Sequence, residues 1–170
     1  MSTAQRLNTR LFLNLVRHPI KYRLYLLTRL PSAFFSGLRV VKAEEDHCTV
    51  SIPFKWFTKN PFRSTYFACL SMAAEMSTGV LAMAHVYRRQ PHISMLVTRI
   101  EAEFLKKAVG TVHFNCSDGA AIKDAILLAN TTGESRTIVA HSVGTNTAGE
   151  TVALFNITWS FKIKASDHSV

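Results

Sequence analysis

The sequence predicts an α+β domain in which a bent antiparallel sheet wraps around one long apolar helix, with extra helices at the N-terminus. Three observations lead to this fold class. Residues 66–85 form an apolar stretch of helical length whose only charged residue is Glu75. The second half of the chain alternates between apolar and polar residues, as half-buried antiparallel strands do. Apolar residues also recur at helical spacing among residues 7–35.

Size and composition fit one compact domain. The chain has 170 residues, of which 48% are hydrophobic and 18% charged, which excludes a disordered protein and allows a substantial core. The three cysteines, Cys48, Cys69 and Cys116, are widely spaced and form no Cys-x-x-Cys pair. We therefore expect reduced, buried thiols and a cytoplasmic location.

The N-terminal segment, residues 1–36, is expected to be basic, amphipathic and helical, and to precede a main domain of residues 37–170. Residues 1–43 hold eight basic and no acidic side chains, while the whole chain carries +9. Basic residues interrupt every apolar run, which argues against a signal peptide. We expect surface helices with a solvated basic face; weak contact with a membrane surface or an anionic ligand is the alternative. No nucleic-acid-binding motif is present, so no nucleic acid partner is expected.

The elements of the main domain follow in a clear order. Strands are predicted over residues 38–43 and 49–54, and the long helix ends at Arg88-Arg89-Gln90-Pro91, with basic residues at its negative pole. Further strands are predicted over residues 95–104, 112–116, 136–143 and 153–163, with a short helix over 118–130. In the strand over 95–104 the alternation predicts that one face is shared by Leu96, Thr98, Ile100, Ala102 and Phe104.

The long helix raises two questions. It approaches the ~20 residues needed to span a membrane, but Glu75 and the hydroxyls of Ser77 and Thr78 oppose insertion, so we interpret it as buried inside a protein. A helix that is apolar on every side must be covered all round, and we expect a second subunit to complete the cover. A buried carboxylate such as Glu75 needs a partner, a raised pKa or a chemical role.

At this point the residues resemble a known family. The run Asn-Pro-Phe-Arg-Ser-Thr-Tyr-Phe-Ala at residues 60–68, followed by Glu75 and Gly79 in a long helix, resembles the hotdog-fold thioesterase superfamily. The resemblance is closest to an uncharacterised branch related to the phenylacetic-acid-pathway acyl-CoA thioesterases, and it covers about residues 37–164. Those enzymes typically carry Asn or Gln, a spacer, His-Gly-Gly and then an acid. Asn60 matches the Asn and Glu75 the acid, whereas Tyr66-Phe67-Ala68 replaces His-Gly-Gly.

The resemblance implies hydrolysis of acyl-CoA or a related acyl thioester by a homodimer, or a dimer of dimers, without a cofactor. It makes Glu75 the base or nucleophile, the Phe67 backbone N–H the oxyanion donor and Asn60 an orienting group, with Tyr66 as a candidate catalytic acid. Eight residues of helix rise about 12 Å, so we expect Glu75 to serve a site at the partner's helix N-terminus. Further residues expected to contact substrate are Ser64, Thr65, Ala68, Thr78, Gly79, Arg88 and Arg89.

Alternative interpretations stay open for these residues. Glu75 could be a buried acid satisfied by a hydroxyl or an arginine, Asn60 a turn former, and Tyr66 a core or interface aromatic. Ser64 or Thr65 is a more natural helix cap than a nucleophile. Because the glycines are replaced, the rival to an enzyme is a non-catalytic acyl- or lipid-binding hotdog module that could be membrane-peripheral, or a structural assembly partner.

Other chemistries lack their motifs. The seven histidines have no metal-ligand spacing, so no metal site is expected. There is no Gly-x-Ser-x-Gly, no phosphate-binding glycine loop and no dinucleotide fingerprint. Thioester chemistry at Glu75 is therefore the enzymatic function that the sequence favours.

Overall fold

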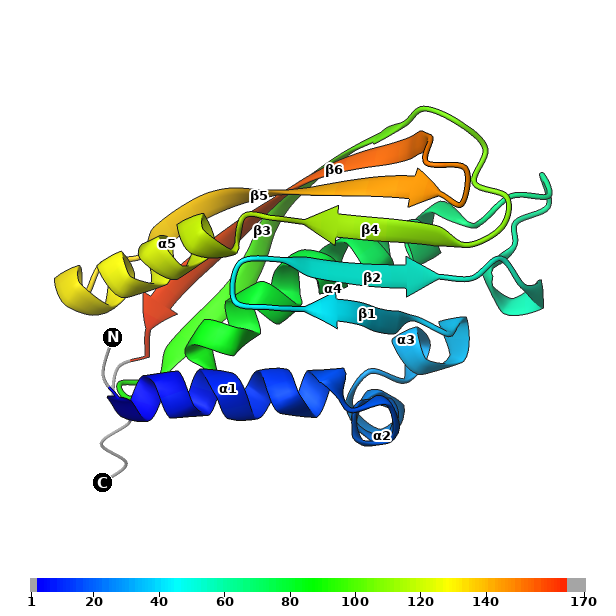
Figure 1. Cartoon of the computed structure of the whole chain (residues 1–170). Coiled ribbons are helices and arrows are strands. Elements are labelled where there is room, and N and C mark those ends of the chain that lie inside the picture. Colours follow the sequence, from blue (N-terminus) through cyan, green and yellow to red (C-terminus); the bar gives the residue numbers. More distant parts are fainter. Residues whose placement is uncertain (1–2, 165–170) are drawn as a thin grey trace, which may run out of the picture.

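A computed structural model describes residues 3–164 (Figure 1). The predicted α+β fold class and the predicted order of elements are confirmed, with most boundaries within three residues of those expected. The helices are α1 (Thr3–Arg17), α2 (Pro19–Arg29), α3 (Pro31–Ser36), α4 (Phe67–Val86) and α5 (Gly119–Thr132), with a 3-10 turn, η1, at Trp56–Thr58. The strands are β1 (Arg39–Ala43), β2 (Cys48–Ile52), β3 (Ile93–Phe104), β4 (Val112–Cys116), β5 (Arg136–Asn146) and β6 (Thr151–Ile163).

The six strands form one antiparallel sheet in the order β1-β2-β4-β5-β6-β3. The sheet twists strongly and α4 crosses one of its faces, while α1, α2 and α3 lie along the β1 side (Figure 1). The alternation predicted for the last strand is confirmed, because Ala153, Phe155, Ile157, Trp159 and Phe161 are all buried. β1 and β3 are the two edges of the sheet.

Helix α4 is the centre of the core. Most of its residues are buried, among them Ala73, Ala74 and Ala82, whose small side chains let the helix lie close to the sheet. By length and composition α4 could cross a membrane, but 67% of its apolar window is buried inside the protein. The interpretation of this stretch as a core helix fits its packing.

The first turn of α4 differs from the expected one. Tyr66 is the N-cap residue, with extended backbone angles and no capping side-chain hydrogen bond. Ser64 and Thr65 do not cap the helix: the Thr65 hydroxyl donates to the Ala108 carbonyl at 3.1 Å, and Ser64 bonds to the Asn60 side chain. The expected hydroxyl cap is therefore wrong, because these hydroxyls hold the preceding loop instead.

The N-terminal helices belong to the same core. Phe12, Leu13 and Val16 of α1 and Tyr22 and Leu26 of α2 are buried, and their outer faces carry basic residues as predicted. The rings of Phe12 and Tyr87 lie 5.3 Å apart. This chain's own helices thus supply part of the cover that we expected from a second subunit, because α1 packs its apolar stripe against α4, and α2 adds a wall to the cavity beside α4.

Strand β3 departs from its predicted pattern. A register shift between Val97 and Arg99 inserts one extra residue, so Leu96 and Thr98 do not share a face with Ile100 and Phe104. A β-bulge of this kind reverses which face of the sheet the following side chains point to. The apolar–polar alternation in the sequence does not show where such a bulge lies. After the bulge, Ile100 and Phe104 stand opposite the buried Ile157 and Ala153, yet they remain 48% and 49% exposed.

Candidate functional site

A cavity of about 820 Å³ opens where the chain enters α4, and we name it the entry cavity. Its lining includes five of the residues that the sequence singled out: Asn60, Ser64, Thr65, Tyr66 and Phe67. The loop before the helix is held by Asn60, whose Oδ1 accepts hydrogen bonds from the backbone N–H of Phe62 at 3.0 Å and of Ser64 at 3.1 Å. Asn60 is thus a turn former, and it lies at the mouth of the cavity at the same time.

Of the four backbone N–H groups of residues 65–68, two are bonded and two are free among residues 3–164. The Tyr66 N–H donates to the Thr58 carbonyl at 2.7 Å and the Thr65 N–H to the Ala108 carbonyl at 2.8 Å, which fixes the chain as it enters α4. Among residues 3–164, no acceptor takes a hydrogen bond from the next two N–H groups, those of Phe67 and Ala68. Free N–H groups at the positive end of a helix dipole can bind a carbonyl oxygen or an oxyanion.

Aromatic rings stand at the first two positions of the run that replaces His-Gly-Gly, Tyr66 in place of the His and Phe67 in place of the first Gly. The Tyr66 and Phe67 rings are 4.9 Å apart and meet edge to face, and Phe67 in turn lies 6.4 Å from Phe104. Tyr66 and Phe67 remain 45% and 55% exposed. These rings give the entry cavity an apolar wall that suits an acyl chain, and they also narrow it.

Basic residues that the sequence analysis missed surround the same cavity. Lys59, Lys106 and Lys107 line it, and its lining contains no acidic residue. Lys106 forms an ion pair with Glu150 at 2.6 Å. The sequence does not indicate this cluster. Lys106 and Lys107 follow β3 in the chain, and only the tertiary fold places them next to the start of α4.

Glu75 faces a second cavity, of about 300 Å³, which we name the Glu75 cavity. Its walls come from α1, α2, α4, β3 and β6, and include Phe12, Tyr22, Tyr25, Met95 and Trp159. Within the described part of the chain, no group donates a hydrogen bond to the Glu75 carboxylate and no basic side chain pairs with it. Burial raises the pKa of Glu75 above its usual value. The alternative of an acid satisfied by a hydroxyl or an arginine therefore does not describe this side chain.

Two neighbours on α4 shape the surroundings of Glu75. A Cβ atom at Gly79 would lie 3.1 Å from Glu75 Oε1 and 3.4 Å from the Trp159 ring, so the glycine leaves room for the carboxylate. The Thr78 hydroxyl does not face this cavity: it donates to the Glu75 carbonyl and accepts from Trp159 Nε1, both at 2.9 Å. Thr78 thus holds the wall of the cavity in place.

The fold does not bring all the expected residues together. Arg88 and Arg89 lie past the opposite end of α4, and Arg89 is only 6% exposed, with Nη1 donating to the His85 carbonyl at 3.4 Å. Glu75 and the Phe67 N–H open into different cavities, separated by about 12 Å of helix. In the described residues, no cluster of His, Cys, Asp and Glu could hold a metal ion.

Solved structures with a similar fold come from several bacteria. A Pseudomonas aeruginosa protein of unknown function, described as a probable thioesterase, has 20% sequence identity and a TM-score of 0.73 over 86% of this chain and 97% of its own. A Haemophilus influenzae thioesterase has 14% identity and a TM-score of 0.65 over 85% and 92%. The Escherichia coli PaaI protein from the phenylacetic acid degradation operon has 15% identity and a TM-score of 0.61 over 84% and 91%. At such low identity these similarities establish the fold.

Sequence comparison places the chain in a family. No curated protein matches it. Residues 27–161 match the family described as "Domain of unknown function (DUF4442)", a stretch that runs from α2 to the end of β6. The chain therefore belongs to the DUF4442 family and has the hotdog fold.

Proposed function

We propose that this protein hydrolyses acyl thioesters, of coenzyme A or a related carrier, in the cytoplasm. The observation that carries the proposal is the Glu75 carboxylate, which has no partner among residues 3–164 and lies in an apolar cavity, on the same helix as the N–H groups of Phe67 and Ala68, which are free within those residues. Glu75 takes a proton from water while the water oxygen attacks the thioester carbon, or Glu75 attacks that carbon itself and water then cleaves the resulting anhydride. In either route the carbonyl oxygen gains negative charge and is stabilised by the two N–H groups. The C–S bond breaks, the thiolate takes up the proton lost by water, and the free acid is released.

The same proposal requires two copies of the chain. Along α4 a strip stays half-buried in the single chain, comprising Ala68, Ser71, Met72, Glu75 and Met83. The free edge of β3 adds the exposed Ile100 and Phe104 next to it. Unpaired edges and apolar patches favour association, and a two-fold dimer would set two α4 helices antiparallel. Glu75 of each chain would then approach the entry cavity of the partner.

The lysines at the entry cavity suggest where the phosphates of the coenzyme would bind. Lys59 and Lys107 are both exposed at the entry cavity, whose lining contains no acidic residue. Ammonium groups bind phosphate well. The partner's Arg88 would come near this cavity in an antiparallel dimer, since it lies past the C-terminal end of α4. Arg89 is too deeply buried to reach a ligand without rearrangement.

A thiol-release assay over short, long and aromatic acyl-CoA substrates tests this function. Glu75→Gln should lower turnover about 10²-fold or more, the range for removal of a general base. Asp124→Asn, at an exposed acid on α5, is the matched control and should leave turnover unchanged. Equal rates for wild type and Glu75→Gln would remove Glu75 from the mechanism.

The second candidate is a non-catalytic acyl-binding module, which the Tyr66-Phe67 rings favour because they narrow the entry cavity. Its basic N-terminal helices would allow contact with a membrane surface. Saturable binding of acyl-CoA without thiol release in the same assay would support this candidate against the enzyme.

A further inference from the structure

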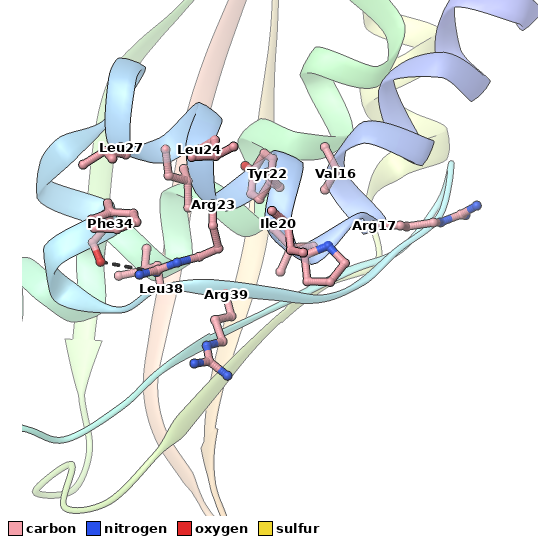
Figure 2. A pocket seen from close by; sticks show the side chains of 13 residues that line it. Val16, Arg17, Ile20, Tyr22, Arg23, Leu24, Leu27, Phe34, Leu38 and Arg39 are labelled. Carbon is pink, nitrogen blue, oxygen red and sulfur yellow. Dashed lines mark hydrogen bonds between the residues drawn. The ribbon is translucent and has the colours of Figure 1, made fainter.

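A third cavity, of about 440 Å³, lies beneath α2 and is separate from both cavities described above (Figure 2). We name it the arginine cavity. It lies between the N-terminal helices and β1, and its apolar walls include Val16, Tyr22, Leu26, Phe34, Leu38 and Val40. Its volume falls within the range of about 300–1,000 Å³ typical of small-molecule sites.

Three arginines line the arginine cavity, and its lining contains no acidic residue. Arg23 is fixed: its guanidinium lies 4.0 Å from the centre of the Phe34 ring, and Nη1 donates to the Phe34 carbonyl at 3.3 Å. Arg17 Nε donates to the Ala43 carbonyl at 2.7 Å. The Arg39 side chain pairs with no group among residues 3–164 and extends outward from the rim in Figure 2. A guanidinium binds a carboxylate through paired N–H donors.

One side of this cavity is open and apolar. Ile20, Leu24 and Leu27 of α2 line it while remaining 68%, 58% and 40% exposed. Deeper in, Leu26 and Leu38 are fully buried. An apolar surface that ends in a closed floor is better suited to a single alkyl chain than to a flat bilayer, and covering it would remove apolar area from water.

We propose that the arginine cavity binds a monomeric long-chain carboxylate. The alkyl chain would lie between Leu24, Leu27 and the floor at Leu38, and the carboxylate would meet Arg23 at the rim, where the nearby Arg39 adds positive charge and could turn toward it. Tyr22 is the shared wall between this cavity and the Glu75 cavity. The Glu75 cavity itself is a poor site for such an anion, because it contains a carboxylate and no basic residue.

Calorimetric titration of the full-length protein with monomeric laurate tests the proposal. We expect saturable binding of one laurate per chain, and binding of dodecanol at least about tenfold weaker, because the alcohol lacks the charge-assisted hydrogen bonds. Arg39→Gln should weaken laurate binding, and Arg23→Gln/Arg39→Gln should weaken it about tenfold or more. Arg29→Gln, on the same helix but outside the cavity lining, should have no effect.

Further variants distinguish laurate binding in the arginine cavity from binding in the Glu75 cavity or at a membrane surface. Glu75→Gln should leave laurate affinity unchanged, and Arg39→Gln should leave the unfolding midpoint unchanged, because that side chain makes no polar contact within residues 3–164. The proposal is overturned if laurate does not bind, or if both arginine variants bind it like wild type. It is also overturned if Glu75→Gln alone alters binding, or if anionic phospholipid vesicles bind while monomeric laurate does not. None of these readouts depends on thioester hydrolysis.

Discussion

The carboxylate of Glu75 lies so close to Gly79 that a side chain at residue 79 would crowd it. A Cβ atom at Gly79 would lie 3.1 Å from Glu75 Oε1, a separation at which the side chain must move. The two residues are one helical turn apart on α4 and face the same cavity. The position of the proposed catalytic carboxylate is therefore set by its neighbour on the helix, together with the Trp159 ring on β6.

Gly79→Ala should change activity more than stability. The added methyl group displaces the end of a flexible side chain, and alanine is better than glycine in a helix by about 1 kcal/mol, so the free energy of unfolding should change by about 1 kcal/mol or less. The carboxylate must shift by a few tenths of an ångström, which should lower thiol release by up to about tenfold, since a misplacement of about 1 Å costs about 10²-fold. Urea unfolding and the thiol-release assay measure the two effects, and undiminished turnover would contradict this role for Gly79.

The stability of the protein should depend on pH through Glu75. Its pKa is raised by burial in the folded state, so above the unfolded-state pKa the folded chain binds more protons than the unfolded one. Stability is then lost as pH rises toward and through the folded-state pKa. Glu75→Gln removes this loss. The unfolding free energy of the variant minus that of wild type should be larger at about pH 8 than at about pH 5; an equal difference at both would show that the pKa is not raised.

Thr78→Val should destabilise the fold by about 1–3 kcal/mol. The Trp159 Nε1–H donates to the Thr78 hydroxyl at 2.9 Å, and Trp159 is 3% exposed, so valine leaves a buried donor without a partner. Thr28→Val is the matched control, since its hydroxyl also bonds back along a helix but is exposed. Chemical denaturation should show a loss for the first variant and about 0.5 kcal/mol or less for the second.

The cysteines should be unreactive in the folded protein. Cys48, Cys69 and Cys116 are free and buried, and burial raises the pKa of each thiol, that of Cys116 to about 11. Since the thiolate is the reactive form, a disulfide reagent at neutral pH should modify none of them, and all three after denaturation. Rapid modification of one thiol in the native protein would contradict the packing of β2, β4 or α4.

Much of the fold could be predicted because local patterns coincide with tertiary roles. Strand β6 lies inside the sheet, so its alternation from Ala153 to Phe161 is fully expressed as burial. β3 is an edge strand with a bulge after Val97, so the same kind of prediction was wrong there for Leu96. The hydroxyl cap was also wrong, since Thr65 bonds to Ala108, 43 residues away.

The candidate site was predictable only in part. The apolar run around Glu75 indicated its burial, and residues 60–68 indicated the helix entry that now forms the entry cavity. The sequence did not predict the shape of either cavity. Lys106 and Lys107 come next to Asn60, and Tyr22 next to Glu75, only through contacts between distant elements, and no local pattern records such contacts.

A site built from two chains can be tested by complementation. Tyr66 has extended backbone angles, and Phe67 is the first residue of α4, a position that accepts proline. Phe67→Pro therefore deletes one of the two proposed oxyanion donors with little effect on the helix. Phe67→Ala keeps that N–H and is the control, which should stay active.

The most direct measurement is thiol release by a refolded equal mixture of Glu75→Gln and Phe67→Pro chains. Each variant alone should turn over about 10²-fold more slowly than wild type, or more slowly still. Random pairing into two-fold dimers gives mixed dimers in about half of the population, each with one intact site, so the mixture should recover about a quarter of wild-type turnover. A mixture that forms mixed dimers but stays inactive would contradict a site that joins Glu75 of one chain to the Phe67 N–H of the other.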